Sequence, residues 1–361
     1  MPFAPARQDR SLPPVRVNLY SDTQTRPSLE MKQAMMEAPV GDEQYGDDPT
    51  VHALCDRVAE LLHKEAATFL PTGTMCNQVA LLTHCRPGDE VLAHRAAHII
   101  TSEGGAPGAL SGVMVTGLSG ERGQFDVATL MAALRLRTRY APPQTLVAVE
   151  QTSNSGGGSI WPLEGLVAVV EAAHEHGLAT HMDGARMLNA TVATGISAQQ
   201  MAAGFDSVWL DFTKGLGAPL GAVLCGSRSF IDAAWRWKQR LGGAMRQAGL
   251  CAAGCLYALD HNVARLTQDH ENARHLARHL AALAGLDVQE PETNLVFFDT
   301  SGIGLTAEEF AGRLLQRGVM ISVMGRYRAR ACTHLDVSRA AVDEALAVIR
   351  TVVDAACSVS K

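Results

Sequence analysis

Apolar positions along the chain fall into short continuous runs separated by stripes at helical spacing. The runs predict buried strands at residues 66–70, 90–93, 113–115, 145–150, 178–182 and 207–212. The stripes predict helices between them, for example through Val51, Leu54 and Val58 and over residues 163–176. Strand and helix alternate from residue 66 to about 226, which predicts right-handed crossovers and a mostly parallel sheet covered on both faces.

The pattern becomes mainly helical after residue 226. We expect helices at 229–239 and at about 250–283, the second joining two domains. Strands at 295–298, 319–323 and 328–333 and a closing helix that begins at Ser338 predict a smaller C-terminal domain. We therefore expect an N-terminal arm at 1–15, flexible because of its prolines, a large domain at 16–250 and a small domain at 251–361.

Composition narrows the class of protein. A chain of 361 residues with 47% hydrophobic content can bury sizeable cores. Its net charge of −6 leaves no excess of basic side chains for nucleic acid, so small molecules are the expected partners. The eight cysteines include no CxxC pair, which favours reduced thiols over a metal site. No apolar run approaches the roughly 20 residues of a membrane span, and the first residues lack a secretory core. We expect a cytoplasmic protein.

Two charged residues follow successive predicted strands. Asp183 comes at the end of the strand at 178–182, and Lys214 follows the strand at 207–212, directly before the Gly-Leu-Gly of 215–217. Pyridoxal 5'-phosphate (PLP) needs a lysine for its Schiff base and an acid for its pyridine nitrogen. The pair therefore predicts a PLP site, with a surface lysine and a turn aspartate as the alternative.

Two further stretches fit the same cofactor. In PTGTMCN (71–77), Gly73 and Thr74 lie where a strand turns into a helix, and the free N–H groups of a helix start attract anions such as phosphate. His98 follows the strand at 90–93, and its imidazole can stack on a ring and move protons near neutral pH. An ordinary turn and a structural histidine are the alternatives.

Eight motifs occur in order along the chain: SDTQTRPS, GDEQYGDDPT, FLPTGTMCN, AAHI, HMDGARMLNA, TKGLGAPLGAVLCG, GGAMRQAG and THLDVS. Together they resemble the motifs of the low-specificity L-threonine aldolases over about residues 17–340. The resemblance implies the aspartate-aminotransferase-like fold type I of PLP enzymes: an α/β large domain with a mostly parallel seven-stranded sheet, and a small C-terminal α+β domain. It also implies cleavage of L-threonine, L-allo-threonine or a related β-hydroxy-α-amino acid to glycine and an aldehyde. A β-eliminating lyase, a racemase and a catalytically silent PLP-binding protein remain alternatives.

The resemblance also assigns roles to individual residues. It implies that Arg246 reaches the cofactor phosphate of a neighbouring subunit, which predicts a homodimer or homotetramer with active sites at the dimer interface. The other roles are the Schiff base for Lys214, the pyridine nitrogen for Asp183, stacking for His98, the phosphate for Gly73 and Thr74, and a clamp on the substrate carboxylate for Ser21, Arg186 and Arg330, with Arg186 also next to the cofactor.

One position departs from the pattern of the family. Many members have Thr-His-Asn where this chain has Thr152, Ser153 and Asn154. The missing histidine lies near the substrate hydroxyl in those relatives, so His98 or an ordered water is the expected base here. The smaller Ser153 should leave room for a larger β-substituent, and we expect phenylserine to be favoured over threonine.

Overall fold

The computed structural model describes residues 12–359, which form two compact units. One unit comprises residues 26–265. The other combines residues 12–25 with residues 266–359. Of the predicted N-terminal arm, residues 1–11 lie outside the described residues. Each unit has a sheet of its own.

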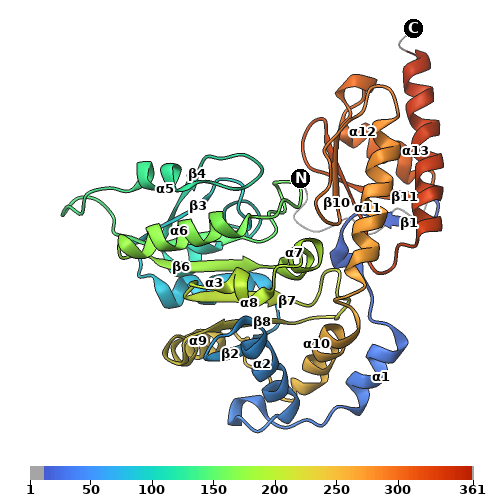
Figure 1. The fold of residues 1–361 in the computed structure, drawn as a ribbon. Helices are drawn as coiled ribbons and strands as arrows, with labels where there is room; N and C mark the ends of the chain where they lie inside the picture. Colours follow the sequence, from blue (N-terminus) through green and yellow to red (C-terminus); the bar gives the residue numbers. More distant parts are fainter. Residues whose placement is uncertain (1–11, 360–361) are drawn as a thin grey trace. The chain divides into compact units, whose positions relative to one another are not determined.

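In the larger unit, the described strands form a seven-stranded sheet (Figure 1). Only β8 runs antiparallel to its neighbours β2 and β7, and the other pairings are parallel, so the mostly parallel sheet is confirmed. The periodicity missed β8, which follows β7 after a short connection. The order across the sheet is β2 (Ala66–Leu70), β8 (Ala222–Gly226), β7 (Ser207–Asp211), β6 (Ala179–Gly184), β5 (Gln144–Glu150), β3 (Glu90–His94) and β4 (Met114–Leu118).

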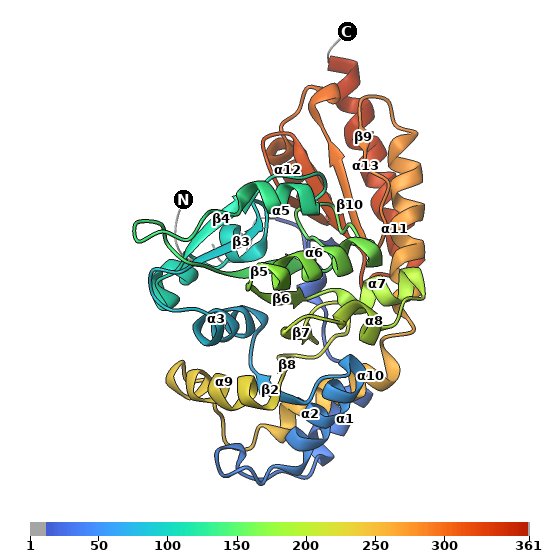
Figure 2. The same cartoon turned by 60° about the vertical axis from the view of Figure 1, so that its left-hand side comes forward.

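Helices cover both faces of this sheet (Figure 2). On one face α3 (Gly73–His84) packs against α9 (Arg228–Arg240). On the other face lie α2 (Pro49–Leu62), α5 (Val127–Ala133), α6 (Leu163–Glu175) and α8 (Ala198–Ala202). Strands β3, β7 and β8 are buried at every position, as expected for strands covered on two sides. Short helices follow β3 and β6, namely α4 (His98–Thr101) and α7 (Met187–Thr194).

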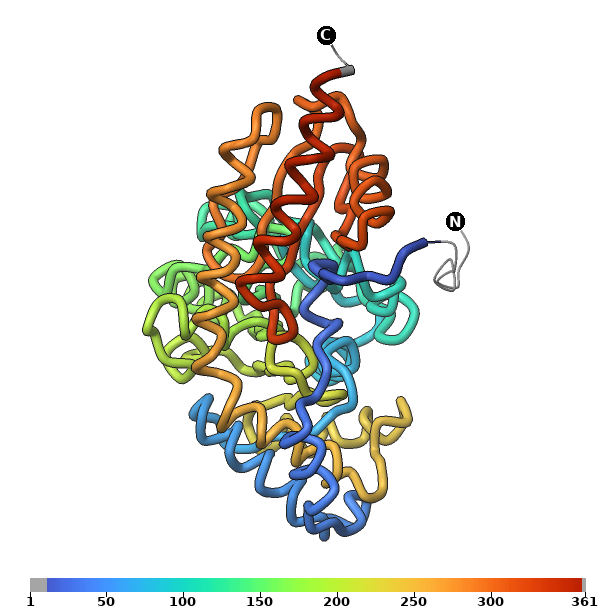
Figure 3. The backbone as a smooth tube through the Cα atoms, turned by 90° about the vertical axis from the view of Figure 1, so that its right-hand side faces the viewer, coloured from blue at the N-terminus to red at the C-terminus, as the bar shows by residue number. Residues whose placement is uncertain are grey.

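The smaller unit is a five-stranded sheet with helices, in the described part of the chain. Its strand order is β1 (Val17–Leu19), β11 (Val319–Val323), β12 (Arg328–Cys332), β10 (Leu295–Asp299) and β9 (Asp287–Val288). Strand β1 pairs in parallel with β11, so the first ordered segment belongs to the C-terminal unit; Figure 3 shows it beside the C-terminal helix. The helices are α11 (Leu266–Ala281), α12 (Ala307–Leu315) and α13 (Arg339–Val359).

The predicted long helix at 250–283 is wrong. It is two helices, α10 (Gly249–His261), which packs on α1 (Leu29–Glu37), and α11. Asn262 ends α10, and its side-chain Nδ2 donates to the Leu216 carbonyl at 2.8 Å, in the loop after β7. The two units meet between residues 265 and 266, beyond the expected boundary at 250. A tertiary hydrogen bond ends the helix, and an apolar stripe that continues past it cannot reveal such a bond.

Within residues 12–359, no helix combines the length and the apolar character needed to cross a bilayer. All eight cysteines are free thiols.

The core of the smaller unit generates a stability prediction. Phe310 of α12 is fully buried, and its ring makes an edge contact with Phe298 at 6.0 Å between centroids. We expect Phe310→Ala to lower the free energy of unfolding by about 3–5 kcal/mol, because it leaves a cavity. Chemical denaturation measures the change. Leu136→Ala, at an exposed position, is the control and should change it by less than about 0.5 kcal/mol. A loss at Phe310 as small as the control's would show that this core is not tightly packed.

Candidate active site

The carboxyl ends of four neighbouring strands bring polar side chains to one edge of the larger unit's sheet. His98 begins α4 shortly after β3, and Glu150 is the last residue of β5. Asp183 lies at the end of β6, and Lys214 follows β7. Because β5, β6 and β7 pair in parallel, their carboxyl ends lie side by side, and open α/β sheets bind ligands at this edge.

Asp183 is a buried carboxylate with partners on both oxygens. Oδ1 accepts the Ala185 amide N–H at 3.0 Å, and Oδ2 accepts from Asn77 Nδ2 at 2.9 Å. Burial raises the pKa of Asp183 above its ordinary value, although His98, Asn77 and Lys214 oppose that shift. A cationic ring N–H against this carboxylate would favour its charged form.

Lys214 lies in a turn that Asp211 holds. The Asp211 carboxylate forms an ion pair with Lys214 Nζ through Oδ2, and its Oδ1 accepts from the amide N–H and hydroxyl of Thr213 at 3.0 and 2.8 Å. The Lys214 ammonium also lies 5.7 Å from the centre of the Trp209 ring. The lysine is thus held at the end of β7 by a buried acid and an aromatic face.

His98 is tied to two acids. Its backbone N–H donates to Glu150 Oε2 at 2.8 Å, and its Nδ1–H donates to Glu103 Oε1 at 2.8 Å. Burial alone would lower the pKa of His98, but the hydrogen bond to Glu103 and the nearby charges of Asp183, Glu103 and Glu150 outweigh it, so the pKa is raised. The imidazolium form of His98 is therefore stabilised relative to that of a free histidine.

The residues predicted to bind an anion, Gly73 and Thr74, begin α3. The Thr72 hydroxyl caps the helix by accepting from the Met75 N–H at 3.2 Å, while the N–H groups of Gly73 and Thr74 point out of the first turn. Gly73 is needed for space, since a Cβ there would overlap the indole of Trp209. The close approach therefore links this turn to β7.

Two other predicted residues of this unit lie in the loops after β5 and β6. Arg186 is buried, and its Nη1 donates to Asn154 Oδ1 at 3.3 Å. Ser153 is also buried, and its Oγ accepts from the Gly156 N–H at 3.2 Å inside its own turn. A Cβ on Gly123 would overlap this hydroxyl, so Ser153 fills a tightly packed corner.

Ser21 and Arg330 belong to the smaller unit and lie close to each other within it. Arg330 is buried on β12, and its Nη2 donates to the carbonyl of Tyr20, the residue before Ser21, at 3.1 Å and to Ser322 Oγ at 3.2 Å. The Ser21 hydroxyl caps a short turn by accepting from the Thr23 N–H at 3.3 Å.

Arg246 lies on the surface of the larger unit. Its guanidinium is 58% exposed and is paired with Asp42 at 2.9 Å. Beneath it, Lys238 and Glu43 form a buried ion pair, and Glu43 also accepts the Met245 N–H at 2.9 Å. The loop that carries Arg246 is therefore held rigidly.

Sequence reasoning missed the buried polar residues that support these groups. Asn77, Glu103 and Asp211 contact the predicted residues directly, as does Glu150. The available signal was a charged or amide side chain inside an otherwise apolar strand or helix, since buried polar groups need partners.

Three side chains also lie close enough together for a metal site. The ligand atoms of His98, Glu103 and Asp183 are within 4.8 Å of one another. However, Asn77 Nδ2 donates to both carboxylates, at 2.7 Å to Glu103 and 2.9 Å to Asp183. The acids are therefore already satisfied by N–H donors, which favours an organic cofactor at this edge.

Comparison with known proteins identifies the family of the chain. The model of the β-eliminating lyase family matches residues 18–302. The low-specificity L-threonine aldolase of Escherichia coli K12 is 41% identical over 333 residues, covering 92% of this chain and 97% of the relative. The low-specificity L-threonine aldolase 1 of Arabidopsis thaliana is 37% identical over 329 residues, covering 89% and 92%.

Solved structures show the same fold. The threonine aldolase of Leishmania major superposes with a TM-score of 0.80 at 22% identity, covering 93% of this chain and 99% of that one. An aspartate aminotransferase from Rhizobium meliloti superposes with a TM-score of 0.69 at 17% identity, covering 94% and 92%. The fold type I architecture is thereby confirmed. From the family model and the identities over most of its length, the chain belongs to the β-eliminating lyase family, within its low-specificity L-threonine aldolase branch.

Proposed function

We propose that this protein is a PLP-dependent aldolase that cleaves β-hydroxy-α-amino acids to glycine and an aldehyde. The observation that carries the proposal is the position of Asp183 and Lys214 at the carboxyl ends of the adjacent parallel strands β6 and β7. The names of the aldolase relatives support the reaction class.

The donor set of this edge fits the chemistry of PLP. Lys214 would hold the aldehyde carbon, Asp183 the ring nitrogen, and the N–H groups of Gly73 and Thr74 the phosphate, with His98 stacked on the ring. When bound, PLP supplies an electron sink for the bonding electrons of Cα and Cβ.

Proton handling falls to His98 in this proposal. Cleavage between Cα and Cβ requires that the β-hydroxyl lose its proton, and the Nε2 of His98 is the candidate acceptor. Its Nδ1–H donates to Glu103, which stabilises the imidazolium once the proton has arrived. An ordered water is the second candidate for this role.

Recognition of the substrate carboxylate is proposed for Arg330, Arg186 and Ser21. A guanidinium can bind both carboxylate oxygens at once, which suits the two arginines. In the smaller unit, the bonds from Arg330 to Tyr20 and Ser322 hold its guanidinium in a fixed orientation.

Self-association is part of the proposal. The larger unit exposes apolar side chains that a partner could cover, and the rigid loop with Arg246 supports a role toward the phosphate of a neighbouring subunit. A homodimer is the minimum unit in this view, and a homotetramer the extended one. The exposed apolar residues of the larger unit include Leu29, Met36, Val40, Tyr45 and Leu250.

Substrate preference is proposed to follow from Ser153. The support for room for an aryl group on the β-carbon is the smaller volume of serine compared with histidine, since the Ser153 hydroxyl itself is bonded within its own tightly packed turn. Because the family model is described as a β-eliminating lyase, β-elimination remains the second candidate reaction.

The cofactor assignment predicts a covalent link at one lysine. We expect the purified protein to absorb visible light, and borohydride reduction followed by peptide mapping to place PLP on Lys214. Lys214→Arg should abolish the label, since a guanidinium does not form the link, whereas Lys32→Arg, at an exposed position, should keep it. A label on another lysine would refute the assignment.

The reaction predicts defined products. With L-threonine, L-allo-threonine and phenylserine we expect glycine and the matching aldehyde, with the highest kcat/KM for phenylserine. Product analysis by chromatography distinguishes the rivals: an oxo acid with ammonia would indicate β-elimination, and scrambling of the enantiomers a racemase. A higher kcat/KM for threonine would contradict the role proposed for Ser153.

Glu150 predicts a pH dependence of stability. Burial, together with the charge of Asp183, raises the pKa of Glu150 to about 7 from its ordinary 4.5. The folded state therefore binds this proton more tightly than the unfolded state, and the wild type loses stability as pH rises from about 4.5 through 7. Glu150→Gln cannot ionise. In cofactor-free protein, the melting temperature of Glu150→Gln minus that of the wild type should therefore be larger at pH 8 than at pH 5.

Thermal unfolding by circular dichroism at both pH values measures this shift. Glu164→Gln, at an exposed position, is the matched control and should show a constant difference from wild type. A constant difference for Glu150→Gln as well would mean that Glu150 does not carry the extra proton in the folded state.

A further inference from the structure

A buried amide lies between the two acids that serve the proposed cofactor site. Asn77, in the first turns of α3, is 1% exposed. Its Nδ2 donates one hydrogen to Asp183 Oδ2 at 2.9 Å and the other to Glu103 Oε1 at 2.7 Å. Its Oδ1 accepts from Trp209 Nε1 at 2.7 Å and from His181 Nε2 at 3.1 Å. All four hydrogen-bonding positions of the amide are therefore used.

The orientation of this amide is determined by groups that act in one direction only. An indole N–H can donate but not accept, so the carbonyl of Asn77 must face Trp209. Ionised carboxylates can accept but not donate, so the NH₂ group must face Asp183 and Glu103. A flipped amide would leave the indole N–H facing NH₂ hydrogens and two carboxylates facing a carbonyl oxygen.

The same argument determines the direction of a longer series of hydrogen bonds behind the amide. Because Asn77 Oδ1 accepts, His181 must carry its proton on Nε2, and its Nδ1 must accept from the Ser207 hydroxyl at 2.8 Å. Ser207 Oγ in turn accepts from His84 Nε2 at 2.8 Å. Burial lowers the pKa of His181 to about 3 and that of His84 to about 4, so both rings are neutral near pH 7 and each carries a single N–H.

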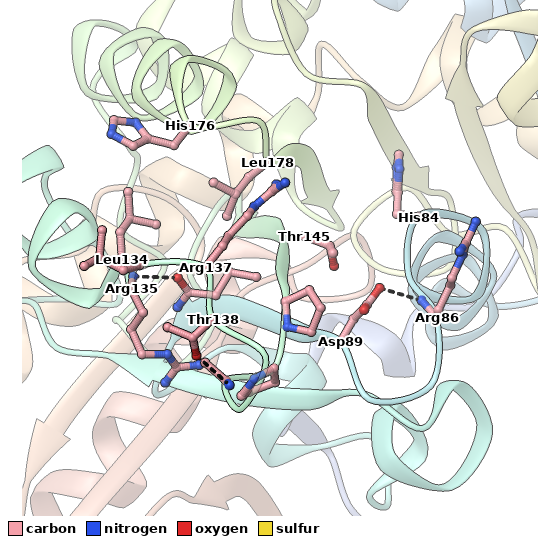
Figure 4. A pocket seen from close by; sticks show the side chains of 15 residues that line it. His84, Arg86, Asp89, Leu134, Arg135, Arg137, Thr138, Thr145, His176 and Leu178 are labelled. Carbon is pink, nitrogen blue, oxygen red and sulfur yellow. Dashed lines mark hydrogen bonds between the residues drawn. The ribbon is translucent and has the colours of Figure 1, made fainter.

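This series of hydrogen bonds runs from the edge of the sheet with the proposed cofactor site to the opposite edge. His84, at its far end, lines a cavity of about 680 Å³ formed by the loops that precede β3, β5 and β6 (Figure 4). Every donor in the series points from this cavity toward the two acids. The hydrogen-bond dipoles therefore add up, and they stabilise negative charge on the acids in a buried environment.

We infer that Asn77 is a positioning residue that fixes Asp183 and Glu103 together, with its amide orientation set by Trp209 and His181. The inference rests on the proposed function for the roles of the two acids. Asp183 would face the ring nitrogen, and Glu103 orients the stacking His98. One amide thus keeps both groups in register.

The decisive variant is Asn77→Asp, which keeps the shape and the acceptor toward Trp209 and His181. At pH 8 it replaces two donors by a third carboxylate, so we expect the affinity for PLP to fall about 10- to 100-fold relative to wild type. At lower pH the new acid takes up a proton and can donate one bond again. The wild-type affinity for PLP divided by that of the variant should therefore become smaller as pH falls from 8 to 6. The titratable groups around this position are Asp183, Glu103, Glu150, His98, His181 and Lys214.

Titration of cofactor-free protein with PLP, followed by visible absorbance at pH 6, 7 and 8, measures the ratio. Asn272→Asp is the matched control, because Asn272 is a buried amide of the smaller unit bonded to Val337 and Arg339. The ratio of its affinity for PLP to that of the wild type should stay near one at each pH. A loss at Asn77→Asp that is the same at each pH would overturn the inference, because it would reflect packing alone.

Trp209→Phe is the second variant, and it tests the inference by itself if Asn77→Asp does not fold. It keeps an aromatic ring next to Gly73 but removes one of the two donors to Asn77 Oδ1, so His181 alone holds the amide oxygen and the amide is fixed less firmly. We expect a loss of PLP affinity of about three- to tenfold; an unchanged affinity would overturn the inference. If the wild type itself took up no PLP, the proposed function would fail. The orientation of Asn77 would then be tested by unfolding, since the melting-temperature deficit of Asn77→Asp should narrow as pH falls.

Discussion

The parallel pairing of β5, β6 and β7 is the constraint on which the site depends. Parallel strands end at the same edge, so residues far apart in sequence, Glu150, Asp183 and Lys214, arrive side by side. The hydrogen-bond ladder sets their spacing before any side chain interacts. The helices on both faces keep water from the strands and hold this ladder rigid.

Burial at this edge creates an electrostatic problem that the surrounding polar groups solve. Several acids lie close together out of water, where charge is costly unless each oxygen is paired. Backbone N–H groups donate to Glu150, Asn77 donates to two acids, and Lys214 forms an ion pair with Asp211.

Close packing couples the parts of the site to one another. Trp209 packs on Gly73, lies near the Lys214 ammonium and donates to Asn77. One indole therefore contacts the turn proposed for phosphate, the proposed Schiff-base lysine and the amide that holds Asp183. This explains why the helix start needs a glycine, since any side chain there would displace the ring.

The sequence alone determined six of the seven strands of the main sheet, the residues at their ends and the family. Apolar runs register burial directly, and the spacing of Asp183 and Lys214 reflects the strand–helix repeat. Only the tertiary structure decided where α10 ends, that β1 joins the C-terminal unit, and how the buried polar groups pair. The reason is physical: local patterns record whether a side chain faces a core, whereas a hydrogen bond between Asn77 and Asp183 depends on geometry across 106 residues of chain. Ser153 illustrates the same limit, since its sequence position suggested a pocket wall and its hydroxyl is bonded within its own turn.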